Sequence, residues 1–304
     1  MKRKRSRVFL LYGLVLMLGG LFSLTLYFFI LKPPGSVTAP GREKRFSPER
    51  PDKREVPRPR PFMPDPARPK VAIIIDDLGY DLKVAKAFMR MELPVTLSIL
   101  PLAPFTKNIA HEAKMRGLEI LLHQPMEPGG YPRVDPGPGA LLLSMSPIQI
   151  VGVLDANLKQ IPGVKGINNH MGSSFTMNRD KMGVVAKVLR QERLFFIDSR
   201  TSKGTVALEE MGRHRVPGRP RDVFLDNELA SHAIDGQIAR LLCVAEREGS
   251  AIGIGHPHPM TLERLMKNRE RLHKRARMVP VSELMDPSYN LRKNKALPSK
   301  QVRR

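Results

Sequence analysis

Cysteine and tryptophan are the residues that this sequence most lacks. Its 304 residues include one cysteine, Cys243, and no tryptophan. A single cysteine excludes an intrachain disulfide, and a chain without disulfides is compatible with either side of a membrane. Cys243 lies in the segment IARLLCVAE, whose apolar spacing is helical, so we expect a buried and unreactive thiol.

Motifs of several common enzyme classes are also absent. The chain has no G-x-S-x-G segment, which would form the nucleophile elbow of many serine hydrolases. It has neither a P-loop sequence nor the G-x-G-x-x-G pattern of dinucleotide-binding folds. The sequence therefore gives no support to serine-nucleophile chemistry, to P-loop nucleotide hydrolysis or to a bound dinucleotide.

Acidic residues are scarce at the two ends of the chain, and this explains its net charge of +22. Residues 1–70 contain 16 Lys/Arg and 5 Asp/Glu, and residues 288–304 contain 6 basic residues and no acidic one. The middle of the chain has an ordinary globular composition. Because the basic ends lack interleaved aromatic residues and any groove-reading motif, we do not expect nucleic acid as a partner.

The N-terminal region predicts a membrane anchor. Residues 1–7 (MKRKRSR) are basic, and residues 8–31 form a run of 24 residues without charge. A helix of this length would reach ~36 Å at ~1.5 Å per residue, enough to cross a ~30 Å hydrocarbon core. The run ends in FFILKPPG, which offers no small-x-small cleavage site, so we expect a retained signal anchor.

The regions around this span define the expected topology. Five basic residues adjoin the span on its N-terminal side, which favours residues 1–7 in the cytoplasm. The remainder would face the periplasm or extracytoplasmic space of a bacterial inner-membrane protein. Residues 32–69 are rich in proline and arginine and predict a linker, whereas residues 288–304 predict a disordered basic tail.

Residues 70–287 alternate between apolar strands and helical segments. The predicted strands are 71–75, 95–100, 119–123, 166–169, 194–198, 222–226 and 251–255. Helical spacing follows most of them, with Ser146 and Asn178 as candidate N-caps and Pro147 at the first helical position. About seven strands separated by helices indicate a parallel sheet covered by helices, and both an open sheet and a barrel fit the pattern.

Polar and titratable residues gather where these strands end. They are Asp76 and Asp77, His123, Asn168, Asn169 and His170, Asp198, Asp226, and His256 and His258. Working residues of parallel α/β folds lie at the carboxyl ends of strands. Aspartate and histidine are zinc ligands as well as proton-transfer groups. The pattern therefore predicts a metal or acid–base site at this edge of the sheet.

Five blocks of the chain carry a family resemblance. VAIIIDDLGY (71–80), LLHQPMEP (121–128), GINNHMGSSFT (166–176), FFIDSRTS (195–202) and AIGIGHPHP (251–259) occur in the order typical of divergent polysaccharide deacetylases. The sequence resembles this family over roughly residues 70–287. The resemblance implies a distorted, incomplete (β/α) barrel and a metal-dependent amide hydrolase that acts on N-acetylated sugars.

The resemblance also implies a role for individual residues, which we divide into four groups. The catalytic group comprises Asp76 as base, His256 as general acid and Asp198 as the carboxylate that supports His256. The metal group comprises Asp77 and His123, with His170 as the third ligand. Glu127 is an alternative third ligand, because a second family histidine is replaced there by glutamate. Asn168 and Asn169 would orient the base or the substrate, in place of an arginine that the family's third motif normally has.

The resulting hypothesis is a membrane-anchored hydrolase that removes acetyl groups from a cell-envelope polysaccharide with a divalent metal, most simply zinc. Its expected partners are that polysaccharide and the inner membrane. The alternative hypothesis is a non-catalytic envelope factor that binds glycan or an envelope protein through the same cleft. The altered ligand pattern at residues 127 and 170 is compatible with both.

Overall fold

The structure, a computed structural model, describes residues 68–285. The predicted signal anchor at 8–31, the basic segment 1–7, nearly all of the 32–69 linker and the basic tail at 288–304 lie outside the described residues. Within residues 68–285, no helix is both long enough and apolar enough to cross a membrane.

Nine strands and eight α-helices build the described part of the chain. The strands are β1 (Lys70–Leu78), β2 (Thr96–Ile99), β3 (Ile120–Met126), β4 (Gly166–Met171), β5 (Phe195–Asp198), β6 (Gly218–Pro220), β7 (Val223–Phe224), β8 (Ser250–Gly255) and β9 (Arg277–Met278). The helices are α2 (Leu82–Met89), α3 (Thr106–Met115), α4 (Pro147–Gln160), α5 (Arg179–Glu192), α6 (Ala207–Arg213), α7 (Ser231–Glu248), α8 (Pro259–Lys267) and α9 (Arg269–Arg275). Two short 3-10 helices, η1 (Phe175–Met177) and η2 (Val281–Leu284), complete the set.

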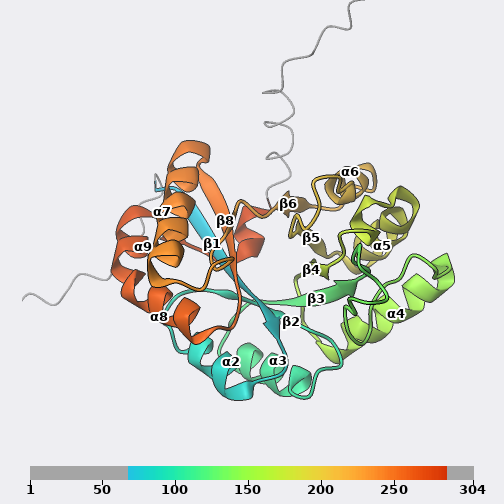
Figure 1. Cartoon of the computed structure of the whole chain (residues 1–304), viewed down its shortest axis with the longest axis horizontal. Helices are drawn as coiled ribbons and strands as arrows, with labels where there is room; N and C mark the ends of the chain where they lie inside the picture. Colours follow the sequence, from blue (N-terminus) through green and yellow to red (C-terminus); the bar gives the residue numbers. More distant parts are fainter. Residues whose placement is uncertain (1–67, 286–304) are drawn as a thin grey trace, which may run out of the picture. The chain divides into compact units, whose positions relative to one another are not determined.

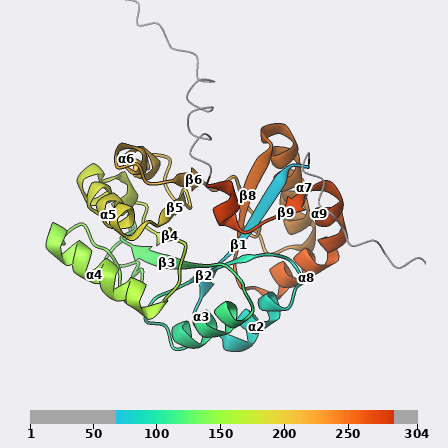
Figure 2. The same ribbon diagram turned by 180° about the vertical axis from the view of Figure 1, so that it is seen from behind.

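The strands form one parallel sheet that curls into an incomplete barrel. Its order is β6-β5-β4-β3-β2-β1-β8-β7, and β9 pairs with β1 at the side. Helices lie around the outside of the curved sheet (Figure 1; Figure 2 from behind). All seven predicted strands are present, and the predicted incomplete (β/α) barrel is confirmed for this region. The strands β6 and β9 were not predicted, because they are too short to show a periodic pattern in the sequence.

The helix ends follow the local sequence signals. Ser146 caps α4 with a complete capping box, in which Ser146 Oγ accepts from Gln149 N and Gln149 Oε1 accepts from Ser146 N. Pro147 begins the helix, and Asn178 Oδ1 caps α5 through Lys181 N. One expectation was wrong, because Cys243 is exposed. On α7 it lies beside the buried Leu242 and faces solvent, since a helix that packs on one side buries only one stripe.

The inside of the barrel is closed by its own small core. The main core lies between the sheet and the helices. A second cluster fills the interior with Ala72, Ile74, Leu121, Phe195, Ile197, Ile252, Ile254, Val279, Val281 and Leu284. Val279 N donates to Val71 O at 2.9 Å, so the segment after β9 is attached to the end of the barrel where β1 begins. Only the carboxyl ends of the strands remain for a site.

Candidate active site

Strand alternation delivers several polar side chains to the barrel interior. On β1, Ile74 belongs to the inner cluster, and Asp76 follows it by two residues on the same face. Asp76 is 2% exposed. Four further side chains follow an inner apolar residue by two positions: His123, Ser199, Asp226 and His256. The alternation therefore selects which of the polar strand-end residues face the cavity.

Asp77 departs from this alternation, and a bulge in β1 brings it to the same cavity. The register between β1 and β2 shifts between Ile75 and Leu78, and Asp77 has a left-handed φ of 55°. Non-glycine residues pay for this conformation in backbone strain, which is typical of functional sites. Two adjacent carboxylates that a regular strand would point apart thus share one cavity.

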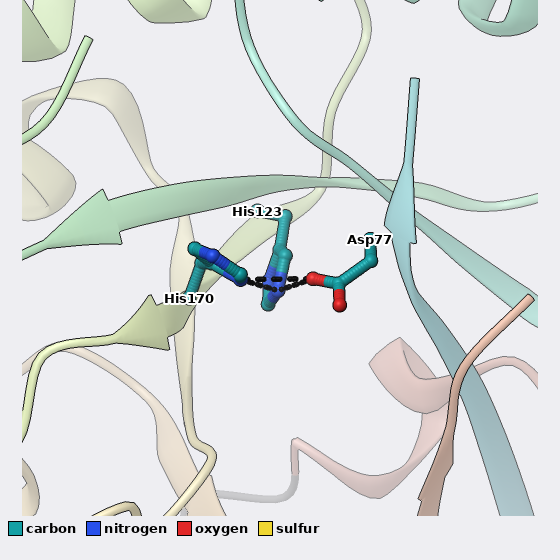
Figure 3. Close-up of side chains that lie close together, drawn as sticks. All are labelled: Asp77, His123 and His170. Atoms are coloured by element: carbon teal, nitrogen blue, oxygen red, sulfur yellow. Dashed lines mark hydrogen bonds and ion pairs between the residues drawn. The ribbon is translucent and has the colours of Figure 1, made fainter. Parts of the chain in front are cut away.

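Asp77, His123 and His170 bring three potential ligand atoms together (Figure 3). Asp77 Oδ1 lies 3.0 Å from His123 Nε2 and 2.8 Å from His170 Nδ1. The two imidazole nitrogens are 3.2 Å apart. The three side chains come from the carboxyl-terminal parts of β1, β3 and β4, and β2 lies between β1 and β3 in the sheet.

This group fits a divalent metal ion such as zinc. Ligand atoms at ~2.0–2.1 Å from a tetrahedral zinc ion are ~3.3 Å from each other, close to the three distances here. Asp77 Oδ1 is buried, yet it accepts no hydrogen bond of regular geometry from the described residues. A carboxylate oxygen and two imidazole nitrogens that converge on one point are better satisfied by a shared cation than by one another. The expected set of Asp77, His123 and His170 is thereby favoured over one that includes Glu127.

Asn168 links the expected base to this group. Its Nδ2 donates to Asp76 Oδ1 at 2.8 Å, and its Oδ1 accepts from His123 Nδ1 at 2.9 Å and from Ser98 Oγ at 2.6 Å. All four side chains are at most 2% exposed. The pairing of His123 with Asn168 across β3 and β4 places the two side chains next to each other.

The Asn168 amide also fixes the tautomer of His123. An ionised Asp76 can only accept hydrogen bonds, so the amide NH2 must face it and the amide oxygen must face His123. His123 Nδ1 therefore carries a proton, and its Nε2 is free to present a lone pair to a metal. One buried asparagine thus prepares both the proton acceptor and a metal ligand.

Asp226 is the carboxylate that supports His256. Asp226 Oδ1 accepts from His256 Nδ1 at 2.8 Å, and Asp226 Oδ2 accepts from His256 N and Thr261 Oγ1. His256 Nε2 points toward the cavity, 4.0 Å from Asp77 Oδ2. Burial opposes protonation of His256, but the hydrogen bond and charge of Asp226 outweigh it and raise the pKa of the ring.

The expectation that Asp198 supports His256 was wrong, because Asp226 occupies that position. Asp198 accepts hydrogen bonds from Arg200 N and Thr205 Oγ1. It follows Phe196, which packs in the outer core, so strand alternation turns its carboxylate toward the helix side. Burial raises the pKa of Asp198 despite these hydrogen bonds. Asp198 therefore shapes the loop after β5 instead of pairing with His256.

Two other predicted residues also have partners outside the cavity. Asn169 Oδ1 accepts from Ser199 N, and its Nδ2 donates to Met171 O, so this side chain ties the ends of β4 and β5 together. Glu127 Oε2 accepts from Leu143 N at 2.7 Å and holds the loop after β3. Of the two asparagines, only Asn168 contacts the expected base among the described residues.

The buried charges perturb one another strongly. Burial raises the pKa of Asp76, and the attraction of His123 and His256 offsets this only in part. Burial also acts to raise the pKa of Asp77, but contacts with His123 and His170 hold it well below its usual range. Burial would lower the pKa of His123, yet Asp76 and Asp77 raise it to about 9. Without metal, His123 is therefore protonated at neutral pH, and its positive charge balances that of the neighbouring carboxylates.

Sequence reasoning missed the roles of Ser98 and Asp226. Ser98 is fully buried and lies between Leu97 and Ile99, which face the helices, so alternation directs it inward. The same period of two puts Asp226 on the face of Phe224. The alternation itself is visible in the sequence, but these strands carry apolar residues on both faces, so the polarity of neighbouring positions does not tell which face is the inner one.

These features define an α/β half-barrel protein whose candidate active site joins aspartates with histidines. A family model described as divergent polysaccharide deacetylase matches residues 73–285. The chain belongs to the divergent polysaccharide deacetylase family.

The chain is also similar to two relatives in bacteria and to one solved structure. An uncharacterized protein of Haemophilus influenzae is 34% identical over 218 residues, 72% of this chain and 77% of that protein. The uncharacterized protein YibQ of Escherichia coli is 33% identical over 217 residues, 71% of this chain and 67% of that protein. The crystal structure of the uncharacterized protein ATU2773 from Agrobacterium tumefaciens is similar with a TM-score of 0.70 and 26% identity, and covers 74% of this chain and 92% of that one.

Proposed function

We propose that this protein is a zinc-dependent hydrolase that removes acetyl groups from the N-acetylated sugars of a cell-envelope polysaccharide. The observation that carries the proposal is the convergence of Asp77, His123 and His170 next to the buried carboxylate of Asp76. Membership of the divergent polysaccharide deacetylase family supports a polysaccharide as the substrate.

Asp77, His123 and His170 would hold the metal. Bound zinc would polarise the acetyl carbonyl group and lower the pKa of a water molecule in the site. Asn168 keeps His123 in the tautomer that can bind, and the bulge at Asp77 holds the carboxylate against both rings. The ligand set of one carboxylate and two imidazoles is common in catalytic zinc sites, which leave one position open.

Asp76 and His256 divide the proton transfers. Asp76 takes a proton from the attacking water, whose oxygen forms a bond to the acetyl carbon. Asn168 Nδ2 holds one oxygen of this carboxylate at 2.8 Å and leaves the other for the proton. When the carbon–nitrogen bond breaks, His256 Nε2 donates a proton to the leaving amine nitrogen. The raised pKa of His256 favours the protonated ring that this step requires.

The direct test is substitution of Asp76. In Asp76→Ala, we expect acetate release from N-acetylglucosamine oligomers to fall by about 10²–10⁴-fold, the range that a general base contributes. Because Asp76 is outside the ligand set, zinc content should stay at the wild-type value. Unchanged acetate release would refute the assignment of the base.

Metal analysis separates the hydrolase from the alternative of a non-catalytic envelope factor. The hydrolase requires zinc in the purified full chain, or acetate release that appears when zinc is added. A protein that retains no zinc and binds the same oligomers without releasing acetate would be a glycan-binding factor.

The proposed site of action is outside the bacterial inner membrane. Support comes from the uncharged residues 8–31 and the basic residues before them. A reporter enzyme that is active only outside the cytoplasm, fused after residue 304, should be active. An inactive reporter, with an active cytoplasmic reporter in its place, would reverse the topology.

A further inference from the structure

Two arginines lie next to the site, near carboxylates with which neither forms a salt bridge. Arg200 follows β5, and Arg221 connects β6 to β7. Within residues 68–285, neither guanidinium forms a salt bridge. Arg200 is exposed and has a left-handed φ of 52°, whereas Arg221 is half-buried. A partly buried cation that makes no salt bridge is compensated only in part by more distant carboxylates, so its presence calls for an explanation.

Arg221 touches the surroundings of both proton-transfer groups. Its guanidinium lies 3.7 Å from the centre of the Phe224 ring, and that ring stacks on His256 with centroids 5.6 Å apart. Its Nε donates to Ser199 O at 2.9 Å. The Ser199 hydroxyl lies 3.4 Å from Asn168 Nδ2, the group that binds the expected base. Arg221 is therefore separated from each proton-transfer group by only one or two side chains.

The Arg221 guanidinium is fixed in orientation but not neutralised. Stacking on Phe224 and the Nε bond to Ser199 hold its plane, while Nη2 makes only a long contact of 3.5 Å with Arg200 O. Burial and the neighbouring charge of Arg200 lower the pKa of Arg221 to about 10, even though nearby carboxylates oppose this shift. Its outer N–H groups remain available to donate hydrogen bonds to a ligand, in the forked geometry that suits an oxyanion.

A purely structural role would explain only part of this arrangement. The Nε bond fastens the loop between β6 and β7 to the end of β5, but it does not explain a second arginine next to the first. Two cations side by side repel each other, and Arg200 adds backbone strain to the same place. An anion that lies between or above the two side chains would turn this repulsion into attraction.

We propose that Arg200 and Arg221 form a subsite for an oxyanion on the glycan, a carboxylate or phosphate group carried by the sugar in the site or by its neighbour. This proposal rests on the proposed function only in taking the ligand to be a glycan. The subsite adds a charge requirement to the substrate, because a neutral polysaccharide would leave both guanidinium groups without a salt bridge.

Binding measurements test this subsite without turnover. The full-length chain in detergent, loaded with zinc and carrying Asp76→Asn, is titrated by calorimetry with three oligosaccharides of equal length. One is a neutral N-acetylglucosamine oligomer, one carries a carboxylate on alternate sugars, and one carries a phosphate ester there. We expect one anionic oligomer to bind about ten- to a hundredfold more tightly than the neutral one, the range of a charge-assisted hydrogen bond. The tighter of the two identifies the source of the oxyanion.

Three variants assign the preference to these side chains. Arg200→Gln and Arg221→Gln should each reduce the preference to within about threefold and leave the neutral oligomer's Kd unchanged. Arg221→Lys should keep part of it, because a point charge remains without the fork. Arg190→Gln is the matched control. It removes an exposed arginine from the last turn of α5, at the opposite end of the barrel, and should change nothing. Melting temperature and zinc content confirm that each variant folds.

Several outcomes overturn the subsite. These are equal Kd values for neutral and anionic oligomers, no binding of either anionic oligomer, or a preference that survives both glutamine variants. If Arg221→Gln slows acetate release equally for all substrates in the Asp76 protein and leaves the ratio of Kd values intact, Arg221 acts on the base instead. A charge preference in a protein that releases no acetate would refute the hydrolase and leave the subsite standing.

Discussion

Replacement of Asn168 by alanine tests the centre of the proposed site. The change removes an amide that serves three buried groups at once, Asp76, His123 and Ser98. Asp76 loses a donor that holds its carboxylate, and His123 Nδ1 loses the acceptor that fixes its tautomer. The ring can then rotate or carry its proton on Nε2, where it competes with the metal.

The size of the effect follows from these contacts. Loss of a hydrogen-bond partner of a metal-binding histidine reduces metal affinity by about 10–100-fold, or ~1.4–2.7 kcal/mol. A buried polar group left without a partner costs ~1–3 kcal/mol of folding stability. Water can fill the space of the amide and reach the orphaned groups, so we expect a total loss of ~1–3 kcal/mol for the zinc-free protein, not three times that.

Zinc titration and denaturant unfolding of the full chain measure the two terms separately. The control is Asn157→Ala, which removes an equally buried asparagine that bonds to Gln124 and to Gly139 O on the α4 side. It should lower stability by a similar amount and leave zinc affinity unchanged. Ser98→Ala should have a smaller effect on zinc, because Asn168 keeps its bonds to Asp76 and His123. Wild-type zinc affinity in Asn168→Ala, with the stability loss present, would refute the reasoning.

Three further predictions concern titration and ligand identity. In zinc-free protein the pKa of His123 is about 9, so zinc must displace a proton from this ring. The apparent zinc affinity should therefore rise about tenfold per pH unit up to about pH 9 and stay constant above it. A zinc affinity that does not change with pH would exclude competition between zinc and the proton. Asp226→Asn removes the charge that raises the pKa of His256, so the high-pH limit of kcat should move to lower pH. A limit that stays in place would show that Asp226 does not tune the acid. His170→Ala should remove most zinc binding and Glu127→Gln should retain it; the reverse result would make Glu127 the third ligand.

The stability of the zinc-free protein provides an independent check of the His123 interpretation. The pKa of this ring is raised from 6.5 to about 9 on folding. The corresponding stabilisation is therefore complete below pH 6.5 and is lost as the pH rises toward 9. Because saturating zinc replaces the proton, the zinc-loaded protein should lack this decline, and an identical decline in both forms would assign it to other groups.

Local sequence patterns predicted much of the architecture. Apolar runs separated by helical segments correctly predicted seven strands, and the two candidate N-caps, Ser146 and Asn178, correctly predicted where their helices begin. Strand ends carry the site because parallel strands direct their carboxyl ends to one edge. Asp76, Asp77, His123 and His170, which lie at such strand ends, were therefore found from the sequence.

The tertiary structure decided the rest, for reasons that are geometric. Alternation along each strand determined that Asp226, not Asp198, reaches His256, but only the curled sheet shows which faces are inner. A bulge put Asp77 into the cavity against the pattern, because a single left-handed residue reverses the direction of its side chain. No sequence pattern between β6 and β7 predicted that Arg221 lies next to the site. Its position depends on where the incomplete barrel brings its two edges, because Arg221 lies in the short connection between the edge strands β6 and β7.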